Sequence, residues 1–523
     1  MTDTAVTPQP GFWNWARTDP GRIAVVEHDG QETTFGEMAA AVNRVSHGLR
    51  ALGLKKGDGV AVVLPNERTF LDVYLAAMQS GLYFTAVNYH LTGPEIAYIV
   101  GDCEASVFVG HARFGEACRA AADELDFPSE RRFAVGDVAG FRPFDDLVAG
   151  QPDAYPDERP AGMVMLYTSG TTGRPKGVRR PLTEADADAT AAAGALSARL
   201  FEVAPGPGVH LCAGPLYHAA PSNFAVNAMH LGQTAVVMDK WTAEGTLERI
   251  ERYRVTTSHM VPTMFHRLLA LPQEMRDRAD VSSLQTIIHA AAPCPVDVKQ
   301  RMFDWWGPII WEYYAATEGG GTFVRPKEWL DHPGTVGQPI AGTVVKAFDD
   351  DGNECPPGQP GTLWMRSSEA VGDFEYYKDK EKTDANHRDG MFTVGDVGYF
   401  DDDGWLFLCD RKSDMIISGG VNIYPAEIEA ALLSHPKVGD AAVIGVPDRD
   451  WGEQVKAVVE PATGVKPGPE LAQELIAFCR ERLAHYKCPR SVDFREHLPR
   501  YATGKLYKRL IKDEYWQGHE RRI

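Results

Sequence analysis

The sequence lacks three features that would indicate a membrane, extracellular or zinc-binding protein. No stretch approaches the about 18 apolar residues of a membrane-spanning helix. Residues 1–11 contain no basic segment followed by an apolar run, so no signal peptide is expected. The eight cysteines show no Cys-x-x-Cys spacing, which disfavours a zinc site or a disulfide framework. We expect all eight to be small buried side chains and the protein to be cytoplasmic.

Basic residues are also too few for binding to a polyanion. The chain has 53 Lys and Arg against 72 Asp and Glu, a formal net charge of −19. Such a surface repels phosphodiester backbones and anionic headgroups, so neither nucleic acid nor membrane is an expected partner. A phosphate-bearing ligand must therefore be held by a local site.

The length of 523 residues exceeds the roughly 300 that one hydrophobic core supports, so at least two domains are expected. Thr34 to Glu37 has a capping-box pattern, and the apolar residues that follow fit one face of a helix ending before Gly53. Buried strands alternate with helices from this point. Strands are expected near 60–64, 83–87, 106–109, 234–238, 256–260, 286–289 and 309–313, and helices near 67–80 and 93–101. This alternation predicts parallel sheets.

The pattern changes after about residue 350. Asp349–Gly352 and Asp401–Gly404 are hairpin-type turns in β-rich sequence, which predicts a small antiparallel unit. A tail with helices at 425–433 and 470–483 follows. The predicted fold class is α/β, with a large N-terminal domain of wound sheets flanked by helices plus a small β unit (1–410). A small α+β C-terminal domain (411–523) follows.

The segment Tyr167–Val178 is the strongest local signal. It combines four hydroxyl side chains, glycines and a lysine, and it follows the apolar run 163–166. Glycines let backbone N–H groups approach phosphates, hydroxyls donate hydrogen bonds and a lysine offsets charge, so the loop suits a polyphosphate. It does not have the Walker A spacing. A flexible linker is the alternative interpretation, which Pro175 and Lys176 disfavour.

At this loop the chain resembles the adenylate-forming superfamily, which includes acyl- and aryl-CoA synthetases, luciferase and peptide-synthetase adenylation domains. Further motifs continue the resemblance in the family's order: Tyr314–Glu318, Gly395–Tyr399, Asp410–Asp414, Gly419–Ile423 and Thr503–Lys505. The look is closest to fatty-acyl-CoA ligases. The resemblance implies that a carboxylate attacks the α-phosphorus of ATP, and that a thiol, usually of coenzyme A, then displaces AMP.

The resemblance also implies the residues of the phosphate end of the site. The phosphate loop is expected to act through Thr168, Ser169, Gly170, Thr171, Thr172, Gly173 and Lys176. Thr317 and Glu318 match the positions near the α-phosphate, and Glu318 and Thr168 are the expected contacts of Mg²⁺. The implied cofactors are thus ATP, Mg²⁺ and coenzyme A as co-substrate.

The remaining implied residues bind the nucleoside or complete catalysis. The adenine is expected against the backbone of Ala290–Pro293, which includes Ala291 and Ala292, and against the ring of Tyr314. Asp396 matches the ribose-binding carboxylate, and Arg411 the basic residue at the domain junction. The resemblance gives Lys505 the bridge between substrate carboxylate and α-phosphate.

The resemblance also implies that the C-terminal domain is mobile, with a hinge near 410–414. In its second orientation the Gly419–Gly420 loop lies beside the pantetheine. Ser413, where Asp or Lys is usual, and Ala315, where Gly is usual, depart from the family pattern.

The acid itself is less well specified. His218 matches a gate of the acyl pocket, and Ala290, Ala291 and Gly319–Gly321 leave room for an apolar group. No charged residue is evident there, which disfavours amino acids and dicarboxylates. We expect an acyl-CoA ligase for a medium- or long-chain fatty acid or a bulky apolar acid. The alternatives are transfer to a carrier protein or an amine, a luciferase-type oxygenase and a non-catalytic sensor. A homodimer is left open.

Overall fold

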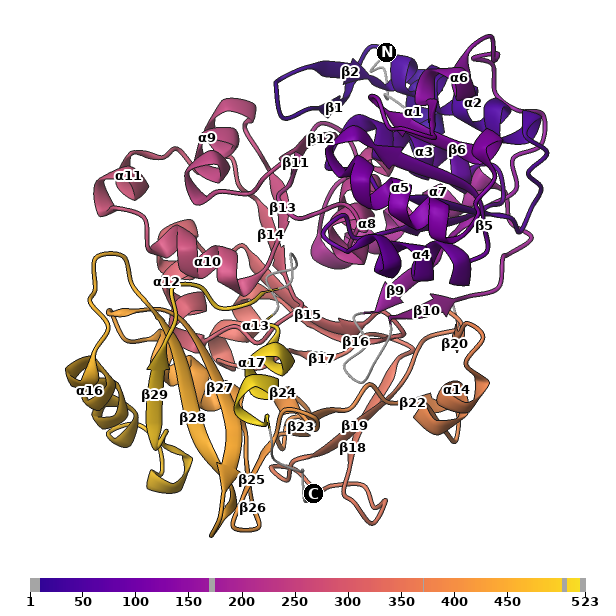
Figure 1. Ribbon diagram of the computed structural model, residues 1–523. Helices are drawn as coiled ribbons and strands as arrows, with labels where there is room; N and C mark the ends of the chain where they lie inside the picture. The colour runs from indigo at the N-terminus through magenta and orange to yellow at the C-terminus, as the bar shows by residue number, and fades with distance from the viewer. Residues whose placement is uncertain (1–9, 169–174, 370, 501–505, 518–523) are drawn as a thin grey trace. The chain divides into compact units, whose positions relative to one another are not determined.

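The computed structural model describes residues 10–168, 175–369, 371–500 and 506–517 (Figure 1). The chain forms two compact units. Unit 1 comprises Met1–His259, Pro272–Ile288 and Gly372–Thr383, and unit 2 comprises Met260–Leu271, His289–Val371 and Asp384–Ile523. The expected boundary at residue 410 falls inside unit 2 and stays a prediction.

The first sheet of unit 1 is wholly parallel, as the alternation of strands and helices predicts. Its strand order is β7-β6-β5-β3-β4-β8, and each neighbouring pair runs parallel. The strands are β3 (Gly59–Val62), β4 (Tyr83–Ala86), β5 (Ala105–His111), β6 (Arg132–Val135), β7 (Arg142–Pro143) and β8 (Met163–Val164).

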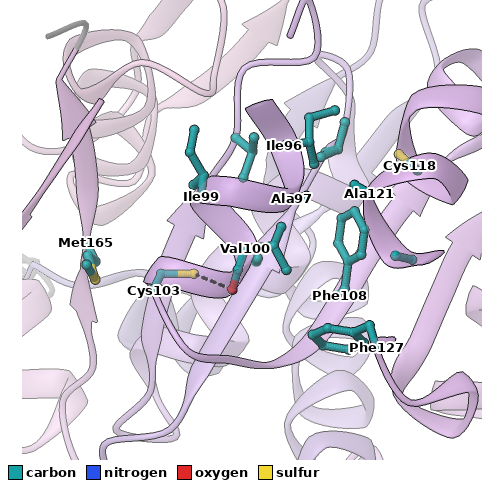
Figure 2. Packing of buried hydrophobic residues seen from close by; sticks show 14 of the residues in the cluster. Ile96, Ala97, Ile99, Val100, Cys103, Phe108, Cys118, Ala121, Phe127 and Met165 are labelled. Atoms are coloured by element: carbon teal, nitrogen blue, oxygen red, sulfur yellow. Dashed lines mark hydrogen bonds between the residues drawn. The ribbon is translucent and has the colours of Figure 1, made fainter. Parts of the chain in front are cut away.

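Helices cover this sheet through apolar faces. Helix α2 begins after Thr34, which accepts from the backbone N–H of Glu37 in the predicted capping box. Figure 2 shows Ile96 and Val100 of α4 and Ala121 of α5 packed in one cluster with Phe108 of β5. The helices of unit 1 are α1 (Phe12–Thr18), α2 (Phe35–Ala51), α3 (Arg68–Met78), α4 (Gly93–Asp102), α5 (Gly115–Glu124), α6 (Phe144–Val148), α7 (Ala187–Ser197), α8 (Ala219–His230), α9 (Ala243–Tyr253) and α11 (Gln273–Arg278).

Unit 1 has a second sheet and a small three-stranded one. The second sheet runs in the order β14-β13-β11-β12-β1-β2, and β2 is antiparallel to β1. In the small sheet, β9 and β20 flank β10 in antiparallel pairs. The strands are β1 (Ile23–Val26), β2 (Glu32–Thr34), β9 (Leu166–Thr168), β10 (Lys176–Arg179), β11 (Val209–Cys212), β12 (Thr234–Val237), β13 (Thr257–Met260), β14 (Thr286–His289) and β20 (Glu375–Tyr376).

Unit 2 contains the predicted antiparallel region. Strand β16 pairs with β15 and β17, and β19 lies between β18, β22 and β23 in a separate sheet. Asp401–Gly404 joins β23 to β24 as a hairpin turn. The strands are β15 (Ile310–Ala316), β16 (Gly319–Val324), β17 (Gln338–Pro339), β18 (Val344–Phe348), β19 (Gly361–Arg366), β21 (His387–Arg388), β22 (Met391–Phe392), β23 (Asp396–Phe400) and β24 (Leu406–Arg411).

The C-terminal part of unit 2 is a sandwich of helices on a sheet. The long pair β27–β28 directs Val443 toward α15 and α16, and the neighbouring Ile444 toward α17, so the two faces carry separate cores. Its strands are β25 (Ile416–Ser418), β26 (Val421–Ile423), β27 (Val438–Asp448), β28 (Gly452–Pro461) and β29 (Ser491–Phe494). The remaining helices are α10 (Pro262–Leu269), α12 (Val296–Trp306), α13 (Pro326–Asp331), α14 (Lys380–Asn386), α15 (Pro425–Leu433), α16 (Pro469–Arg480) and α17 (Lys508–Tyr515).

The predicted fold class is confirmed, with local corrections. Gly319–Gly321, expected to leave room for an apolar group, begins strand β16. The space beside Gly320 is occupied, because a Cβ atom there would lie 2.6 Å from the sulfur of Met365. All eight cysteines are free thiols, but Cys294, Cys355 and Cys409 are only partly buried. In the part of the chain that the structure describes, no helix is long and apolar enough to cross a membrane.

Candidate functional site

Three predicted nucleoside-binding residues meet in unit 2. The hydroxyl of Tyr314 donates to Asp396 Oδ2 at 2.8 Å, and Arg411 Nε lies 3.2 Å from Asp396 Oδ1. Burial, and then the neighbouring Asp396 carboxylate, raise the pKa of Tyr314 well above its usual value, so the phenol stays a proton donor. A carboxylate has about four lone-pair sites, so Asp396 can still accept hydrogen bonds from two neighbouring hydroxyl groups of a ligand.

Strand pairing explains why these side chains converge. Asp396 begins β23 and pairs in register with Arg411, the last residue of β24. Gly395 before it has φ +81°, a backbone conformation that favours glycine and turns the chain into the strand. The Gly-Asp order of the motif is therefore a geometric requirement here.

Thr317 and Glu318 form the tight connection between β15 and β16. Ala316 pairs directly with Gly319, so the two residues occupy a two-residue hairpin turn. Glu318 is buried and Thr317 half-buried. The predicted position of Glu318 after the end of a strand is correct, but the strand returns at once instead of leading into a loop.

The predicted adenine segment connects β14 to α12. Ala290 is buried, whereas Ala291 and Pro293 are exposed and Ala292 is half-buried. Ala291 has φ +77°, a left-handed conformation that costs an alanine about 1 kcal/mol. An accessible backbone in an unfavourable conformation is typical of ligand-binding loops.

A buried ionic cluster, missed from the sequence, lies beside this segment. Lys299 Nζ donates to Glu312 Oε2 at 2.6 Å, and His289 Nε2 lies 3.3 Å from the same oxygen. Burial alone would raise the pKa of Glu312, but Lys299 and His289 lower it to about 2. The sequence offered one indication of this cluster, the positions of its members. His289 directly precedes Ala290, and Glu312 lies on the same face of its strand as Tyr314.

The phosphate loop is held by a hairpin stem in unit 1. Thr168 of β9 pairs with Lys176 of β10, and the hydroxyl of Tyr98 donates to the carbonyl of Pro175 at 3.1 Å. Lys176 Nζ lies 5.1 Å from the ring centre of Tyr376. The predicted residues Ser169, Gly170, Thr171, Thr172 and Gly173 lie outside the described residues.

His218, the predicted acyl gate, precedes α8 in unit 1. Its Nε2 atom is buried and has no hydrogen-bond partner among the described residues. Burial, and then His90, lower its pKa to about 3, so the imidazole is neutral near pH 7. It can therefore offer one donor and one acceptor to an apolar substrate.

Gly419 and Gly420 form the two-residue turn between β25 and β26. Both have positive φ, +57° and +79°, as hairpins of this type require. A Cβ atom on Gly419 would lie 2.3 Å from the ring of Trp451, whereas nothing lies within 4 Å at Gly420. Only the first position therefore excludes a side chain by contact. Ser413 is exposed in the turn that follows Arg411.

The predicted catalytic residue Lys505 lies outside the described residues, but both flanks of its segment are described. Arg500 pairs with Leu506 in an antiparallel bridge, and Tyr507 N–H donates to the carbonyl of Pro499 at 2.8 Å. Arg500 contacts Asp440 through two hydrogen bonds of 2.5 Å. Lys508 Nζ lies 2.9 Å from Glu429 and 3.9 Å from Asp410.

The acidic side chains suit a substrate-bound metal better than a resident one. No group of three or more His, Cys, Asp or Glu able to hold a metal occurs among residues 10–168, 175–369, 371–500 and 506–517. Mg²⁺ typically takes one or two carboxylates and completes its shell with phosphates and water. A single carboxylate such as Glu318 fits this use.

Fold and site together indicate an enzyme that binds a nucleotide. A family model described as AMP-binding enzyme matches residues 12–372, and one described as AMP-binding enzyme C-terminal domain matches residues 427–505. The chain belongs to the AMP-binding enzyme family. The predictions of the adenylate-forming superfamily and of an AMP-forming acid–thiol ligase are confirmed.

Individual relatives differ in the acids and acceptors that their names give. A feruloyl-CoA synthase of Amycolatopsis sp is 34% identical and covers 97% of this chain and 99% of its own. The anthranilate CoA ligase AuaEII with anthranoyl-AMP has TM-score 0.85 and 25% identity, over 97% and 98% of the two chains. The amide bond synthetase McbA from Marinactinospora thermotolerans has TM-score 0.79 and 27% identity, over 96% and 99%.

Proposed function

We propose that this protein is an ATP-dependent acid–CoA ligase that activates an aromatic or other bulky apolar carboxylic acid. The observation that carries the proposal is Asp396, held between the Tyr314 hydroxyl and the Arg411 guanidinium with acceptor sites left for a ribose. The family match supports the chemistry. Two relatives named for aromatic acids support the substrate class.

In the first half-reaction, a carboxylate oxygen bonds to the α-phosphorus of ATP while the bond to pyrophosphate breaks. The protein has little covalent work here, so it must orient the reactants and offset negative charge. We assign this to Lys176 and the phosphate loop, to Thr317 and to Lys505. Glu318 and Thr168 would hold Mg²⁺, which offsets charge on the phosphates.

In the second half-reaction, the thiol sulfur of coenzyme A bonds to the acyl carbon, AMP leaves and the thiol proton passes to solvent. We assign the Gly419–Gly420 turn to the pantetheine and a hinge to residues 410–414, with the mobile domain at 411–523. We assign the acyl pocket to the neutral imidazole of His218, and the adenine to the backbone of exposed Ala291 and half-buried Ala292.

The test is AMP and pyrophosphate release from ATP, with and without coenzyme A. The panel contains hydroxycinnamates, aminobenzoates, indole acids and medium- and long-chain fatty acids. AMP release that needs coenzyme A and an aromatic acid is expected. Turnover with fatty acids alone would move the substrate class to the medium- or long-chain fatty acids that the sequence analysis also allowed. Absence of acid-dependent pyrophosphate release would contradict the proposal.

An amine acceptor is the second candidate, because one solved structure of similar fold is an amide bond synthetase. Such an enzyme would release AMP with an amine in place of coenzyme A. Adding a panel of primary amines to the same assay separates the two acceptors. Mass spectrometry of the product, as thioester or amide, decides between them.

A further inference from the structure

The adenine segment is tethered at both of its ends to one carboxylate. His289 ends β14 immediately before Ala290, and Lys299 lies in α12, which begins at Val296 directly after the segment. Lys299 Nζ donates to Glu312 Oε2 at 2.6 Å, and His289 Nε2 lies 3.3 Å from the same oxygen without hydrogen-bond alignment. Residues 290–298 therefore form a loop whose two ends meet at the carboxylate of Glu312.

The cluster of His289, Lys299 and Glu312 is shielded from water, and its charges nearly cancel. His289 and Lys299 are 0% exposed, and Glu312 is 4% exposed. Lys299 Nζ also lies 4.6 Å from the ring centre of buried Trp329 in α13. Water cannot replace these partners, so the geometry that they impose on the loop is held more firmly than by an exposed ion pair.

The loop needs such a constraint. Ala291 has φ +77°, which an alanine adopts only against a steric penalty, and it is exposed where a ligand can reach its backbone. Glu312 and Tyr314 lie two residues apart in β15 and share one face of the strand. The same strand thus fixes both the loop and the phenol that contacts Asp396.

We propose that His289, Lys299 and Glu312 are positioning residues that hold the adenine loop in its binding conformation and so set the affinity for the nucleotide. This inference rests on the proposed function, because it assigns regulation of affinity to the same site. None of the three is expected to touch the reacting atoms. Their loss should weaken binding of ATP and AMP without a matching change for coenzyme A.

The main variant is Lys299→Met/Glu312→Leu, which removes both charges together and preserves side-chain volume, since loss of one partner would leave a buried charge unpaired. Its matched control is Lys456→Met/Asp493→Leu, which removes a 2.7 Å ion pair between β28 and β29 in the same unit. Isothermal titration measures the Kd of AMP, and steady-state assays give the KM of ATP and of coenzyme A. Thermal unfolding verifies that each variant is folded.

The main variant is expected to bind AMP at least tenfold more weakly, with a parallel rise in the KM of ATP and a KM of coenzyme A within twofold of the parent. The control should bind AMP as the parent does. A folded main variant with parental AMP affinity would overturn the inference. If that variant does not fold, His289→Gln decides in the same way, with a threefold to fivefold loss of AMP affinity expected.

Ala291→Gly, added to the main variant, tests whether the cluster acts through the loop. If the cluster only stabilised the fold, this substitution would not change the AMP affinity. Glycine adopts the left-handed conformation without the penalty, so it should restore at least threefold of the affinity lost in the main variant. No recovery would overturn the link between the cluster and the loop. A parent protein that binds neither ATP nor AMP would instead contradict the proposed function, which distinguishes the two failures.

Discussion

Two segments of unit 2 are anchored by charged side chains in different ways. The adenine loop is closed by two basic side chains on one carboxylate, Glu312, and the cluster is almost fully buried. The segment that carries Lys505 is flanked by Arg500 and Lys508, which contact three carboxylates, Asp440, Glu429 and Asp410. At the first anchor one lysine faces one carboxylate, and burial lowers the pKa of His289, whereas at the second anchor two basic side chains face three carboxylates.

The two anchors shift the pKa values of their lysines, Lys299 and Lys508, in opposite directions. Burial lowers the pKa of Lys299, although Glu312 opposes the change. Burial acts the same way on Lys508, but Glu429 and Asp410 outweigh it and raise the pKa of that lysine. Since Asp410 is the first residue of the proposed hinge, the second anchor connects α17 to that hinge. The first anchor suits a fixed adenine segment, and the second would hold α17 to the proposed C-terminal domain during the proposed rotation.

The largest expected effect comes from Lys505, whose segment the second anchor flanks. Lys505→Ala should slow acid-dependent pyrophosphate release about 10²–10³-fold, because a positioned cation offsetting transition-state charge has this order of effect. Thioester formation from synthetic acyl-adenylate should stay within about threefold of the parent on the two-orientation argument. The control is Arg509→Ala, an exposed basic residue in the next turn. An equal loss of pyrophosphate release and of thioester formation would contradict a role of Lys505 in adenylation alone.

Lys508→Met tests the carboxylate surplus. Removing one partner of a buried ion pair should cost about 3 kcal/mol of unfolding free energy. Urea unfolding of the variant and the parent at pH 5 and pH 8 measures this cost.

The pH dependence of this cost has a defined sign. Burial raises the pKa of Asp410 and of Glu429 even with Lys508 present. A raised folded pKa gives stability that is fully present below the unfolded value of about 4 and is lost as pH rises through the folded value. Loss of Lys508 raises both pKa values further, so the deficit of the variant should be larger at pH 8 than at pH 5. A deficit independent of pH would contradict the electrostatic account.

A smaller effect is expected at the glycine turn of the same C-terminal part. Gly419→Ala should lose about 2 kcal/mol, because alanine is strained at φ +57° and its Cβ meets Trp451 at 2.3 Å. Gly420→Ala is the matched control, with backbone strain alone and a loss of about 1 kcal/mol. Thermal unfolding and the KM of coenzyme A measure both. Equal losses would show that Trp451 yields to the added methyl.

The smallest effect is expected beside the fixed loop. Tyr314→Phe removes the 2.8 Å hydrogen bond to Asp396 and should raise the KM of ATP about fivefold, equivalent to about 1 kcal/mol. The KM of coenzyme A should not change. An ATP dependence equal to that of the parent would indicate that Arg411 alone is sufficient to hold Asp396.

Local patterns in the sequence predicted much of this fold. The capping box at Thr34 and Glu37 begins α2 as expected, and α15 spans Pro425–Leu433 as predicted. These signals are short-range and depend on neighbouring residues only. The order β7-β6-β5-β3-β4-β8 required the tertiary contacts, because a parallel sheet does not reveal its strand order along the chain.

Residues outside the motifs could not be predicted in the same way. Gly319–Gly321 was expected to leave room for an apolar group, yet these residues pair with β15 in strand β16, and Met365 fills the space beside Gly320. Lys299 lies on a helix whose other residues look ordinary, and its meeting with Glu312 depends on the crossing of α12 and β15. The resemblance named the residues expected to touch the nucleotide and gave no information on those behind them.

The position of α17 has a consequence for proteolysis and truncation. The helix is the element that covers Ala442, Ile444 and Val458 on one face of the β27–β28 pair, through Ile511. A chain cut before residue 506 would lose α17 and expose the apolar residues on this one face of β27 and β28, a surface prone to self-association. Nicking by a protease at this point should therefore precipitate the protein rather than leave a shortened soluble form.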